Sequence, residues 1–495
     1  MDQQPSIMER CGPTLSGDPH RVLCRIFIPG DEELVRGTPR VTELLERFEK
    51  LTDGEVDKTL AETLDRFSHR HRDLLADFDH HSAAITHLLP KRDHYTPQQR
   101  QLLGSYLTQE YAFESTAYFN PSIVAHPDQT GVPPGSLRFV MSVRAVGEGH
   151  QSSLVFRTGL LDRDRTIRVD PASPFATNRA TRSTILAGRF VEQAAIEADM
   201  DIAELQFALG MLPKKFTLEE LTTNLHQLLR TRETDMESAQ IIRLLQQLAL
   251  NSYELDFDES TELSERVLWP TASDERRGIE DARFVRFVDD DGDVTYRATY
   301  TGFDGTHVVS RMLETEEFRT FASLRMTGGA VNNKGVAFFP RRIDGRFIAL
   351  SRWDRQSNSV SYSDDGYHWH EAETIHAASD PWELIHVGNC GSPLETEHGW
   401  LVITHGAGPM RQYALGAMLL DLDDPTRVIG AYPGPLLEPT EEERDGYVPN
   451  VVYSCGGLIH NGRLVLPYGF SDCHTGFATA DVEQLIDAMQ PVRSR

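Results

Sequence analysis

Charged and aromatic residues follow five short β-type runs of this 495-residue chain at the same relative position. The five sets are Arg144, Glu148 and His150; Tyr300, Phe303 and Asp304; Arg352, Trp353 and Asp354; His405; and Tyr468, Asp472 and His474. Carboxylates serve as acid and base on a glycosidic bond, and aromatic planes stack on the C–H face of a sugar ring. If the five positions meet in one pocket, the residue types predict a sugar site.

The runs themselves form a weak repeat, in which a polar turn ends in glycine and a β run follows. The turn glycines are Gly135, Gly292, Gly345, Gly399 and Gly462, and the last three intervals are 53, 54 and 63 residues. Periods of about 40 to 50 residues with several strands each are typical of propeller blades. The repeat therefore predicts a five-bladed β-propeller, and a large β-sandwich with fortuitous spacing is the alternative.

Helix-period patterning surrounds and interrupts these runs. Residues 1–112 are expected to form a helical N-terminal region, in which Thr96 is an N-cap followed by proline at the first helical position. Residues 113–173 are the first part of the propeller, 174–265 a helical insertion after its first blade, and 266–495 the remainder. The predicted fold class is mainly β with two helical additions.

Composition excludes some partners. The hydrophobic fraction is 39%, and no run approaches the roughly 18 apolar residues of a membrane span. The net charge of −26 would repel nucleic acid and an anionic bilayer alike. Five cysteines without CxxC spacing, and a first segment without an apolar core, favour the cytoplasm. His69, His71, His80 and His81 are interpreted as a solvated face, so no metal is expected.

Motifs in the second repeat carry a family resemblance. Glu280-Asp281-Ala282-Arg283 is similar to E-D-P-R, and residues 299–305 (TYTGFDG) to T-Y-T-A-Y-D, the signatures of glycoside hydrolase family 130, the β-mannoside phosphorylases and β-mannosidases. Further matches in the family's order are Phe119-Asn120-Pro121, Phe339-Pro340 with Arg352, Gly399-Trp400-Leu401 before His405, Val448-Pro449-Asn450-Val451-Val452, and Tyr468-Gly469 through Asp472. The resemblance covers residues 113–173 and 266–495.

The resemblance implies a five-bladed propeller. It also implies cleavage of a β-mannosidic bond with inversion, by an aspartate acting as general acid and basic residues that hold phosphate. Two positions depart from this pattern: Gly335 stands where the family has the aspartate, and Glu395 where it has a phosphate-binding lysine. A glycine cannot donate a proton, and a carboxylate repels phosphate. These departures favour hydrolysis over phosphorolysis.

We therefore expect an inverting glycoside hydrolase acting on β-mannosides or related oligosaccharides. Glu395 is the predicted base that activates water, and Glu443, or a neighbour in its acidic loop, is the predicted acid at about 6.5–9.5 Å. Asp304 is the fallback acid. The predicted substrate-binding residues are Asn120, Arg144, Asp281, Arg283, Tyr300, Arg352, His405 and Asp472.

Two other functions stay open at this point. A β-mannoside phosphorylase releasing mannose 1-phosphate is favoured by Arg352 and His405, which match the phosphate-binding side of the family. A non-catalytic sugar-binding propeller is favoured by the loss of the acid at Gly335. The expected partner is an oligosaccharide, with no cofactor except inorganic phosphate in the phosphorylase case. The helical regions are candidates for a homo-oligomer interface.

Overall fold

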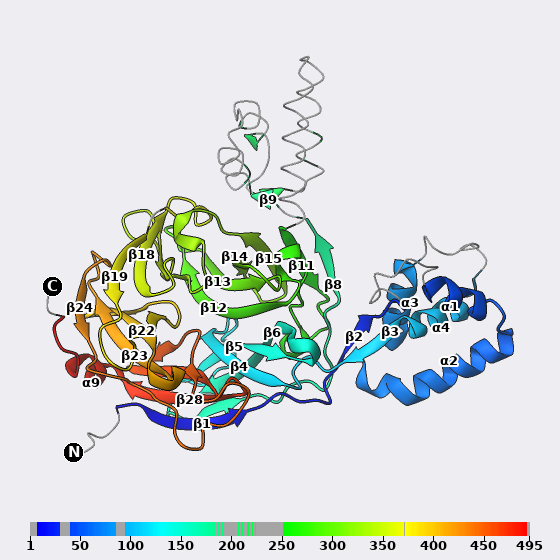
Figure 1. Ribbon diagram of the computed structural model, residues 1–495, viewed down its shortest axis with the longest axis horizontal. Helices are drawn as coiled ribbons and strands as arrows, with labels where there is room; N and C mark the ends of the chain where they lie inside the picture. Colours follow the sequence, from blue (N-terminus) through cyan, green and yellow to red (C-terminus); the bar gives the residue numbers. More distant parts are fainter. Residues whose placement is uncertain are drawn as a thin grey trace, which may run out of the picture.

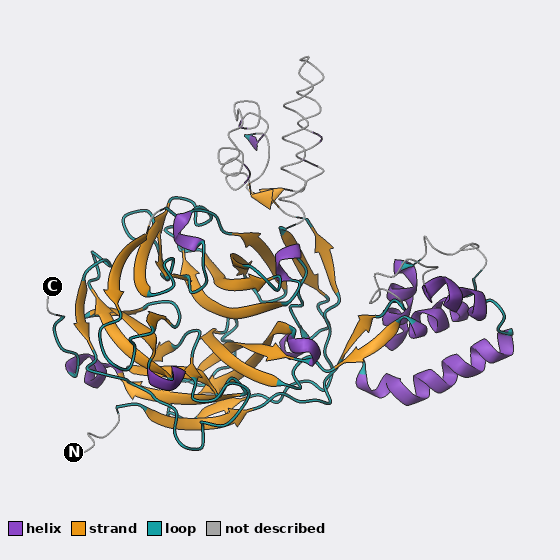
Figure 2. Cartoon of the chain, viewed as in Figure 1, coloured by secondary structure: helices purple, strands orange, loops and turns teal. Residues whose placement is uncertain are grey.

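The computed structural model describes residues 7–29, 40–85, 95–184, 251–370 and 372–492, together with a few scattered positions between 185 and 250. The described part of the chain is mainly β, as expected, and its longer helices lie in the N-terminal region (Figure 2). No helix among the described residues is long and apolar enough to cross a membrane. Most of the predicted helical insertion, including residues 217–219 and 241–250, lies outside the described residues.

Five antiparallel meanders make up the β part. The first contains β4 (Ala117–Ala125), β5 (Leu137–Val146), β6 (Ser152–Leu161) and β7 (Ile167–Val169). The second contains β12 (Gly278–Val288), β13 (Val294–Phe303), β14 (Val308–Thr315) and β15 (Thr320–Arg325). The third contains β16 (Ala337–Phe338), β17 (Phe347–Ser351), β18 (Ser357–Ser363) and β19 (Ala372–Ala377).

The last two meanders begin with divided first strands. The fourth contains β20 (His386–Asn389), β21 (Leu394–Thr396), β22 (Gly399–Ala407), β23 (Tyr413–Leu420) and β24 (Val428–Ala431). The fifth contains β25 (Val452–Tyr453), β26 (Leu458–His460), β27 (Arg463–Phe470) and β28 (His474–Asp481), followed by α9 (Val482–Asp487). Four of the repeat glycines stand between the first two strands of their meanders, and Gly399 is the first residue of β22. All five have positive φ, so the predicted repeat unit is the observed one.

Backbone contacts join each meander to the next and the fifth back to the first. Gly278 pairs with Ser152, Val288 bridges to Arg341, and the Val387 amide donates to the Gln356 carbonyl at 3.0 Å. Tyr413 bridges to Val451, and Ser122 to Gly456. The meanders therefore form a closed ring with their first strands toward the centre (Figure 1).

The N-terminal region contributes strands as well as helices. Its helices are α1 (Arg40–Phe48), α2 (Asp53–Phe67), α3 (Leu74–Ala84) and α4 (Pro97–Tyr106), and α4 has the predicted cap at Thr96. Three strands were not predicted: β1 (Glu9–Leu15), β2 (Leu23–Ile26) and β3 (Thr108–Tyr111). Because β1 pairs with β28, the start of the chain completes the last meander.

The helices have a core of their own. Apolar side chains from all four pack together, including Leu45, Leu60, Phe78 and Leu102. Arg72 joins this region to the ring through a 2.6 Å ion pair with the buried Glu265. The interpretation of the histidines as a solvated face is wrong for His71 and His81, which are buried.

Strands also flank the predicted helical insertion. β8 (Ala180–Ser183) and β11 (Tyr253–Phe257) extend the second meander beyond β15. Tyr253, Leu255 and Phe257 are buried with the period of two that a half-buried strand requires. A further short pair joins β9 (Leu186–Ala187) to β10 (Lys215–Phe216). The predicted helix is thus replaced by β structure at both described ends of this segment.

Candidate active site

Two bulged strands bring Asn120 and Asp281 together. The pairing register shifts between Phe119 and Ser122 in β4 and between Glu280 and Arg283 in β12. Asn120 and Asp281 lie in these bulges with φ of 52° and 54°, a region that non-glycine residues adopt only when their surroundings hold them there. The Asn120 Nδ2 donates to Asp281 Oδ1 at 2.8 Å. The bulges thus aim two buried polar side chains at one another.

Two arginines surround this pair. Arg144 donates to Glu280 Oε1 at 2.6 Å and to Asp281 Oδ1 at 3.3 Å. Arg283 donates to the Asp281 carbonyl at 2.9 Å and to the Tyr453 hydroxyl at 2.8 Å. Burial by itself would raise the pKa of Asp281, but Arg144 and Arg283 outweigh it and lower that pKa to about 2. Asp281 is therefore a carboxylate throughout the physiological pH range.

Arg352 and His405 form a second contact. Arg352 Nη1 lies 3.0 Å from His405 Nε2, and because a guanidinium only donates, Nε2 is the acceptor and the ring proton is on Nδ1. Burial, together with the charge of Arg352, holds the pKa of His405 well below its usual value, so the ring is neutral. Gly388 permits the approach, since a Cβ there would stand 2.5 Å from His405 Cε1 and 3.0 Å from Arg352 Cδ.

Aromatic rings connect the two contacts into one cluster. The Tyr453 ring, whose hydroxyl accepts from Arg283, has its centroid 4.7 Å from that of His405. The His386 ring lies 5.9 Å from His405 on another side. Burial, then the charges of Arg352, Lys334 and Arg411, lower the pKa of His386 to about 4. Both histidines are therefore neutral at physiological pH.

Asp472 lies in the tight turn between β27 and β28. The Cys473 amide donates to the Phe470 carbonyl at 3.1 Å, and both intervening residues, Ser471 and Asp472, have positive φ (52° and 48°). Burial, then the negative charge of Asp281, raises the pKa of Asp472 to about 6, although Arg144, Arg411 and Lys334 act in the other direction. Asp281 and Asp472 thus titrate in different pH ranges.

The cluster is locally positive within an acidic chain. Its five cationic side chains are Arg144, Arg283, Lys334, Arg352 and Arg411, and its three carboxylates are Glu280, Asp281 and Asp472. The chain as a whole has a net charge of −26. Buried polar atoms without a protein partner include the Nε of Arg144, Arg283 and Arg352, Asn120 Oδ1, and both side-chain atoms of Asn389. A buried polar atom without a protein partner calls for another partner, which in a site is an ordered water or a ligand.

Seven of the eight predicted substrate-binding residues are in this cluster: Asn120, Arg144, Asp281, Arg283, Arg352, His405 and Asp472. Tyr300 is not, because its hydroxyl donates to Glu275 at 2.5 Å and contacts Ser323 at 2.6 Å in the buried part of the second meander. Its prediction as a ligand-binding residue is wrong, since the strand directs the side chain into the core.

Neither predicted catalytic glutamate belongs to the cluster. Glu395 forms a 2.6 Å ion pair with Arg341 and lines a cavity of about 340 Å³ with residues from the later parts of β4 and β12. Val285 and Val288 in that cavity are four and seven residues beyond Asp281, which corresponds to about 13–23 Å along a strand. Glu395 is therefore at the opposite end of the first strands from Asp281.

Glu443 holds the N-terminal strand in place. It accepts from Arg10 at 2.7 Å and from the Tyr468 hydroxyl at 2.5 Å. Burial would raise the pKa of Glu443, but these two donors lower it, which is opposite to what a general acid needs. The predicted Glu395–Glu443 pair is thus wrong, because each carboxylate is occupied by an arginine in a different part of the ring.

Asp304, the fallback acid, lies in a surface turn. Its Oδ1 accepts from the backbone amides of Thr306 and His307, both at 2.7 Å. These hydrogen bonds lower the pKa of Asp304 to about 2. The carboxyl caps a turn, a common use of aspartate, and is unsuited to donate a proton.

Sequence reasoning missed five polar residues of the cluster: Lys334, His386, Asn389, Arg411 and Tyr453. They come from loops or strand ends around the second to fifth meanders. Four of them lie outside the position after the second strand that the repeat emphasised, whereas Arg411 lies in the turn directly after β22. Tyr453 had a signal, since it directly follows the Val448–Val452 motif. Lys334 had its place directly before Gly335, and Arg411 its place after the β run of its repeat.

One group of side chains in the described part of the chain has the composition of a metal site: Cys24, His71 and Asp77 in the helical region. The Cys24 sulfur lies 3.4 Å from Nδ1 and 3.8 Å from Nε2 of His71. Nearly equal distances to both nitrogens place the sulfur over the ring face, away from the lone pair that would bind a metal. His71 Nε2 contacts Glu110 at 2.9 Å, and Arg179 pairs with Asp77.

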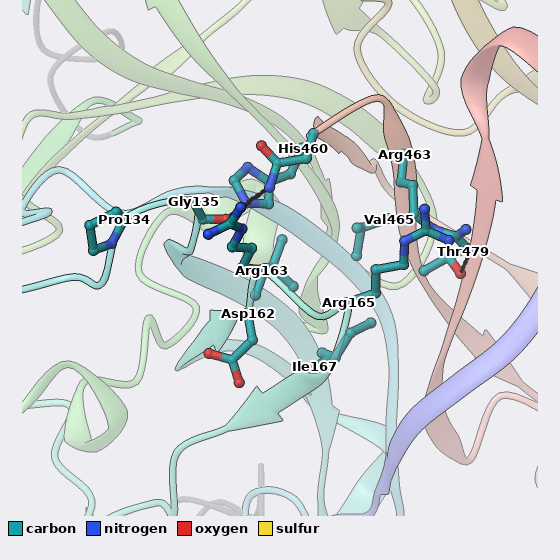
Figure 3. A pocket seen from close by; sticks show the side chains of 12 residues that line it. Pro134, Gly135, Asp162, Arg163, Arg165, Ile167, His460, Arg463, Val465 and Thr479 are labelled. Atoms are coloured by element: carbon teal, nitrogen blue, oxygen red, sulfur yellow. Dashed lines mark hydrogen bonds between the residues drawn. The ribbon is translucent and has the colours of Figure 1, made fainter.

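A cavity of about 490 Å³ opens on the outside of the ring, between turns of the first and fifth meanders. Figure 3 shows Arg163, Arg165 and Arg463 around it. None of the predicted site residues lines it. Its lining combines a hairpin turn with apolar strand ends, so it lies apart from the cluster around Asp281.

Comparisons with known proteins identify relatives of the β part. A family model described as β-1,4-mannooligosaccharide phosphorylase matches residues 249–491. The 1,2-β-oligomannan phosphorylase of Thermoanaerobacter sp. (strain X514) is 32% identical over 232 residues, which span 45% of this chain and 75% of the relative. The β-1,2-mannobiose phosphorylase of Listeria innocua is 31% identical over 228 residues, 44% of this chain and 61% of that protein.

The solved structure of the Listeria innocua enzyme with β-1,2-mannobiose overlaps this chain with a TM-score of 0.44 and 18% identity. The overlap covers 75% of this chain and 92% of that structure.

Proposed function

The chain belongs to glycoside hydrolase family 130, and from this premise we propose that it is a β-mannoside phosphorylase, which transfers a mannosyl group from an oligosaccharide to inorganic phosphate. The observation that carries the proposal is the excess of cationic side chains around Asp281 in a chain that is otherwise strongly acidic. A site for two neutral reactants, a sugar and water, has no need for such an excess. An anionic reactant has one.

The ring of five meanders is proposed to be the five-bladed β-propeller that the sequence predicts. Each meander is antiparallel, the first strands face the centre, and β1 completes the fifth sheet as the last meander closes on the first. In such a ring the loops at one end meet at one mouth of a central channel. The cluster around Asp281 occupies one mouth, and the Arg341–Glu395 pair lies toward the other.

Phosphate is assigned to the side with Arg352, Lys334 and Arg411. Arg352 has a buried Nε without a protein partner, and it meets a histidine that is neutral and does not compete for the anion. Asn333 fixes the loop before Lys334, because its Nδ2 donates to the Arg352 carbonyl at 3.1 Å. Arginine binds a phosphate through directed pairs of hydrogen bonds, and lysine attracts it as a point charge.

The mannosyl group is assigned to the side with Asn120 and Asp281. Asp281 keeps a negative charge at all working pH values, so it accepts hydrogen bonds from sugar hydroxyls, and Asn120 has a free Oδ1. With the phosphate on one side of the anomeric carbon and the aglycone on the other, displacement proceeds with inversion. The C1–O bond to the aglycone breaks as the C1–O bond to phosphate forms.

Hydrolysis is the less favoured function for a structural reason. The case for it depended on Glu395 as a base that would also repel phosphate, but Glu395 is neutralised by Arg341 at the opposite end of the first strands. Gly335 faces the cluster, where its Cβ would stand 3.5 Å from that of Arg352, and its φ of +99° disfavours any other residue. The site is therefore left with its cations and without the predicted base.

Incubation with β-1,2-mannobiose and its longer homologues, with and without phosphate, tests the proposal. We expect mannose 1-phosphate to accumulate only with phosphate, and β-1,4-mannobiose in parallel establishes the linkage. Release of free mannose at the same rate without phosphate would show a hydrolase instead. Binding of the disaccharide without any turnover would show a sugar-binding protein.

A further inference from the structure

The cluster contains three carboxylates, and the roles open to them differ. Glu280 accepts from Arg144 at 2.6 Å, and Asp281 accepts from Asn120 and from the same arginine. The Glu280 carboxyl is thus paired with Arg144, and the lowered pKa of Asp281 holds it as an anion. The side chain of Asp472 has no hydrogen bond or ion pair to a described protein group, so its carboxyl is available to a ligand.

The turn that carries Asp472 is unusually well fixed. The Ser471 amide donates to the Val451 carbonyl at 2.8 Å, and its carbonyl accepts from Val448 at 2.9 Å. The Ser471 hydroxyl donates to the Glu443 carbonyl, and the Cys473 carbonyl accepts from the Tyr118 amide at 2.9 Å. These contacts offset the cost of two consecutive non-glycine residues with positive φ. These contacts hold the backbone from which the Asp472 side chain projects.

We propose that Asp472 is the proton donor of the reaction, the general acid that protonates the departing glycosidic oxygen. The proposal rests on the proposed cleavage of a β-mannoside at this site. As the C1–O bond to the aglycone breaks and phosphate bonds to C1, the proton passes from the Asp472 carboxyl to the aglycone oxygen. The aglycone leaves as a neutral alcohol, and the Asp472 carboxylate regains a proton from water.

The charges around Asp472 suit this role. Asp281 from β12 opposes its ionisation, whereas Arg144 from β5, Arg411 from the turn after β22, and Lys334 from the loop before β16 favour it. Burial and Asp281 prevail, so the pKa of Asp472 rises to about 6 while that of Asp281 falls to about 2. Two carboxyls whose pKa values are driven apart are typical of an acid beside a fixed anion.

The decisive experiment compares two leaving groups in the Asp472→Asn variant. A disaccharide such as β-1,2-mannobiose needs a proton on its departing oxygen, whereas 2,4-dinitrophenyl β-D-mannoside does not. We expect kcat for the disaccharide to fall by about 10²–10⁴-fold with little change in KM. For the dinitrophenyl substrate we expect a fall of less than about tenfold. Equal losses on both substrates, or a rise in KM alone, would show a binding residue and overturn the proposal.

Matched variants separate the loss of the proton donor from a general loss of negative charge. Asp445→Asn removes the same charge from an exposed position of the neighbouring loop and is expected to leave both activities unchanged. Asp472→Glu restores a carboxyl and is expected to recover part of the disaccharide activity. For the wild type acting on the disaccharide, we expect kcat/KM to fall above about pH 6, as Asp472 loses its proton. For Asp472→Asn acting on the dinitrophenyl substrate, we expect no such fall. A wild-type pH profile in which kcat/KM for the disaccharide does not fall above about pH 6 contradicts the proposal.

The test is independent of the nucleophile. If the wild type proves to use water, the proposed phosphorolysis fails, but the leaving-group comparison can be made on the hydrolytic rate and still decides whether Asp472 is the acid. If phosphate is required and the variant loses both substrates equally, phosphorolysis stands and the assignment of Asp472 fails.

Discussion

Two buried clusters of arginine and carboxylate lie in and around the second meander, and they differ in how completely their polar atoms are paired. Around Arg311, every guanidinium nitrogen has a partner: Tyr300, Ser323 and Glu275 on Nε, Asp274 on Nη1, and the Asn251 carbonyl on Nη2. Around Asp281, three arginine Nε atoms and Asn120 Oδ1 have none. The first cluster is complete within the protein, and the second has capacity left for a ligand.

The two clusters also differ in the backbone conformation of their residues. Arg311, Tyr300 and Glu275 have ordinary conformations, whereas Asn120, Asp281 and Asp472 all have positive φ. Strain and unpaired polar atoms cost stability, so a protein retains them where they serve binding or chemistry. A buried ion pair by itself therefore does not mark a site. What marks it is the combination of strain and unused hydrogen-bonding capacity.

The largest effect on stability is expected from Arg311→Met, which removes the central cation of the cluster around Arg311. It leaves the buried Glu275 and the partly buried Asp274 without their cation, and we expect a loss of about 3–5 kcal/mol in the free energy of unfolding. Specific activity of the folded protein at low temperature should change less than threefold, or under about 0.7 kcal/mol. Urea denaturation and steady-state kinetics measure the two.

Arg325→Met is the control, because Arg325 pairs with Arg311 in register on β15 but is exposed. We expect a change of less than about 0.5 kcal/mol. If Arg311→Met abolished activity at unchanged stability, the distinction between the two clusters would be lost.

Arg352→Met removes a cation from the cluster around Asp281, and we expect it to affect binding rather than stability. Loss of a charged hydrogen bond to phosphate should raise the KM for phosphate by about 10–150-fold, which corresponds to about 1.5–3 kcal/mol. Stability should change little, because Arg352 is partly exposed and its one side-chain partner, His405, is neutral. Initial rates over a range of phosphate concentrations give the KM, and a thermal melt gives the stability.

Arg355→Met is the matched control: it removes the same charge three residues away, at an exposed position. An unchanged KM for phosphate in Arg352→Met would remove phosphate from this side of the cluster.

Asp472→Asn is expected to change how the stability of the protein depends on pH. The folded-state pKa of Asp472 is raised from 3.8 to about 6, so the folded protein binds this proton more tightly than the unfolded chain. The resulting stability is complete below about pH 4, declines as the pH rises to about 6, and is absent above. The variant lacks this loss and should exceed the wild type at pH 7.5 by about 1–2 kcal/mol.

Denaturant unfolding at pH 4.5 and pH 7.5 tests this expectation. The advantage of the variant should shrink at the lower pH, where the wild-type carboxyl is largely protonated in the folded protein. A variant less stable than the wild type at pH 7.5 would mean that ionised Asp472 stabilises the fold.

Glu395→Gln should have the smallest effect. The Glu395 side chain is 44% exposed, and its ion pair with Arg341 is a surface pair worth less than about 0.5 kcal/mol. Activity should equal that of the wild type within a factor of two, or about 0.4 kcal/mol. A large loss of activity would return Glu395 to the site and contradict its placement at the far end of the first strands.

Much of this arrangement was predictable because it depends on local chemistry. The five turn glycines located the first hairpin of every meander, since a turn with positive φ favours glycine wherever the chain goes next. The E-D-x-R run and Asn120 could be found because bulged strands bring a dense polar motif into an otherwise apolar segment. The Thr96 cap was readable for the same reason.

Side-chain direction was not predictable in the same way. Tyr300 follows the repeat but faces the core, because successive strand residues point to opposite faces and a position next to the turn does not specify which. Glu395 was predicted from the family resemblance to act at the site, yet it lines a cavity at the opposite end of the first strands from Asp281. Strand β1 was missed since its partner, β28, is more than 450 residues away in the sequence.

By itself, the sequence determined the family, the mainly β class and the residue types available for sugar and phosphate chemistry, because these depend on composition, local turns and contiguous motifs. Only the tertiary structure decided which of the carboxylates meet the cations. Glu395, Glu443 and Asp304 are occupied by an arginine or a turn elsewhere, and Asp472 is left free beside Asp281. The physical reason is that a carboxyl's role depends on its burial and its charged neighbours, and in this ring those neighbours come from five separate segments.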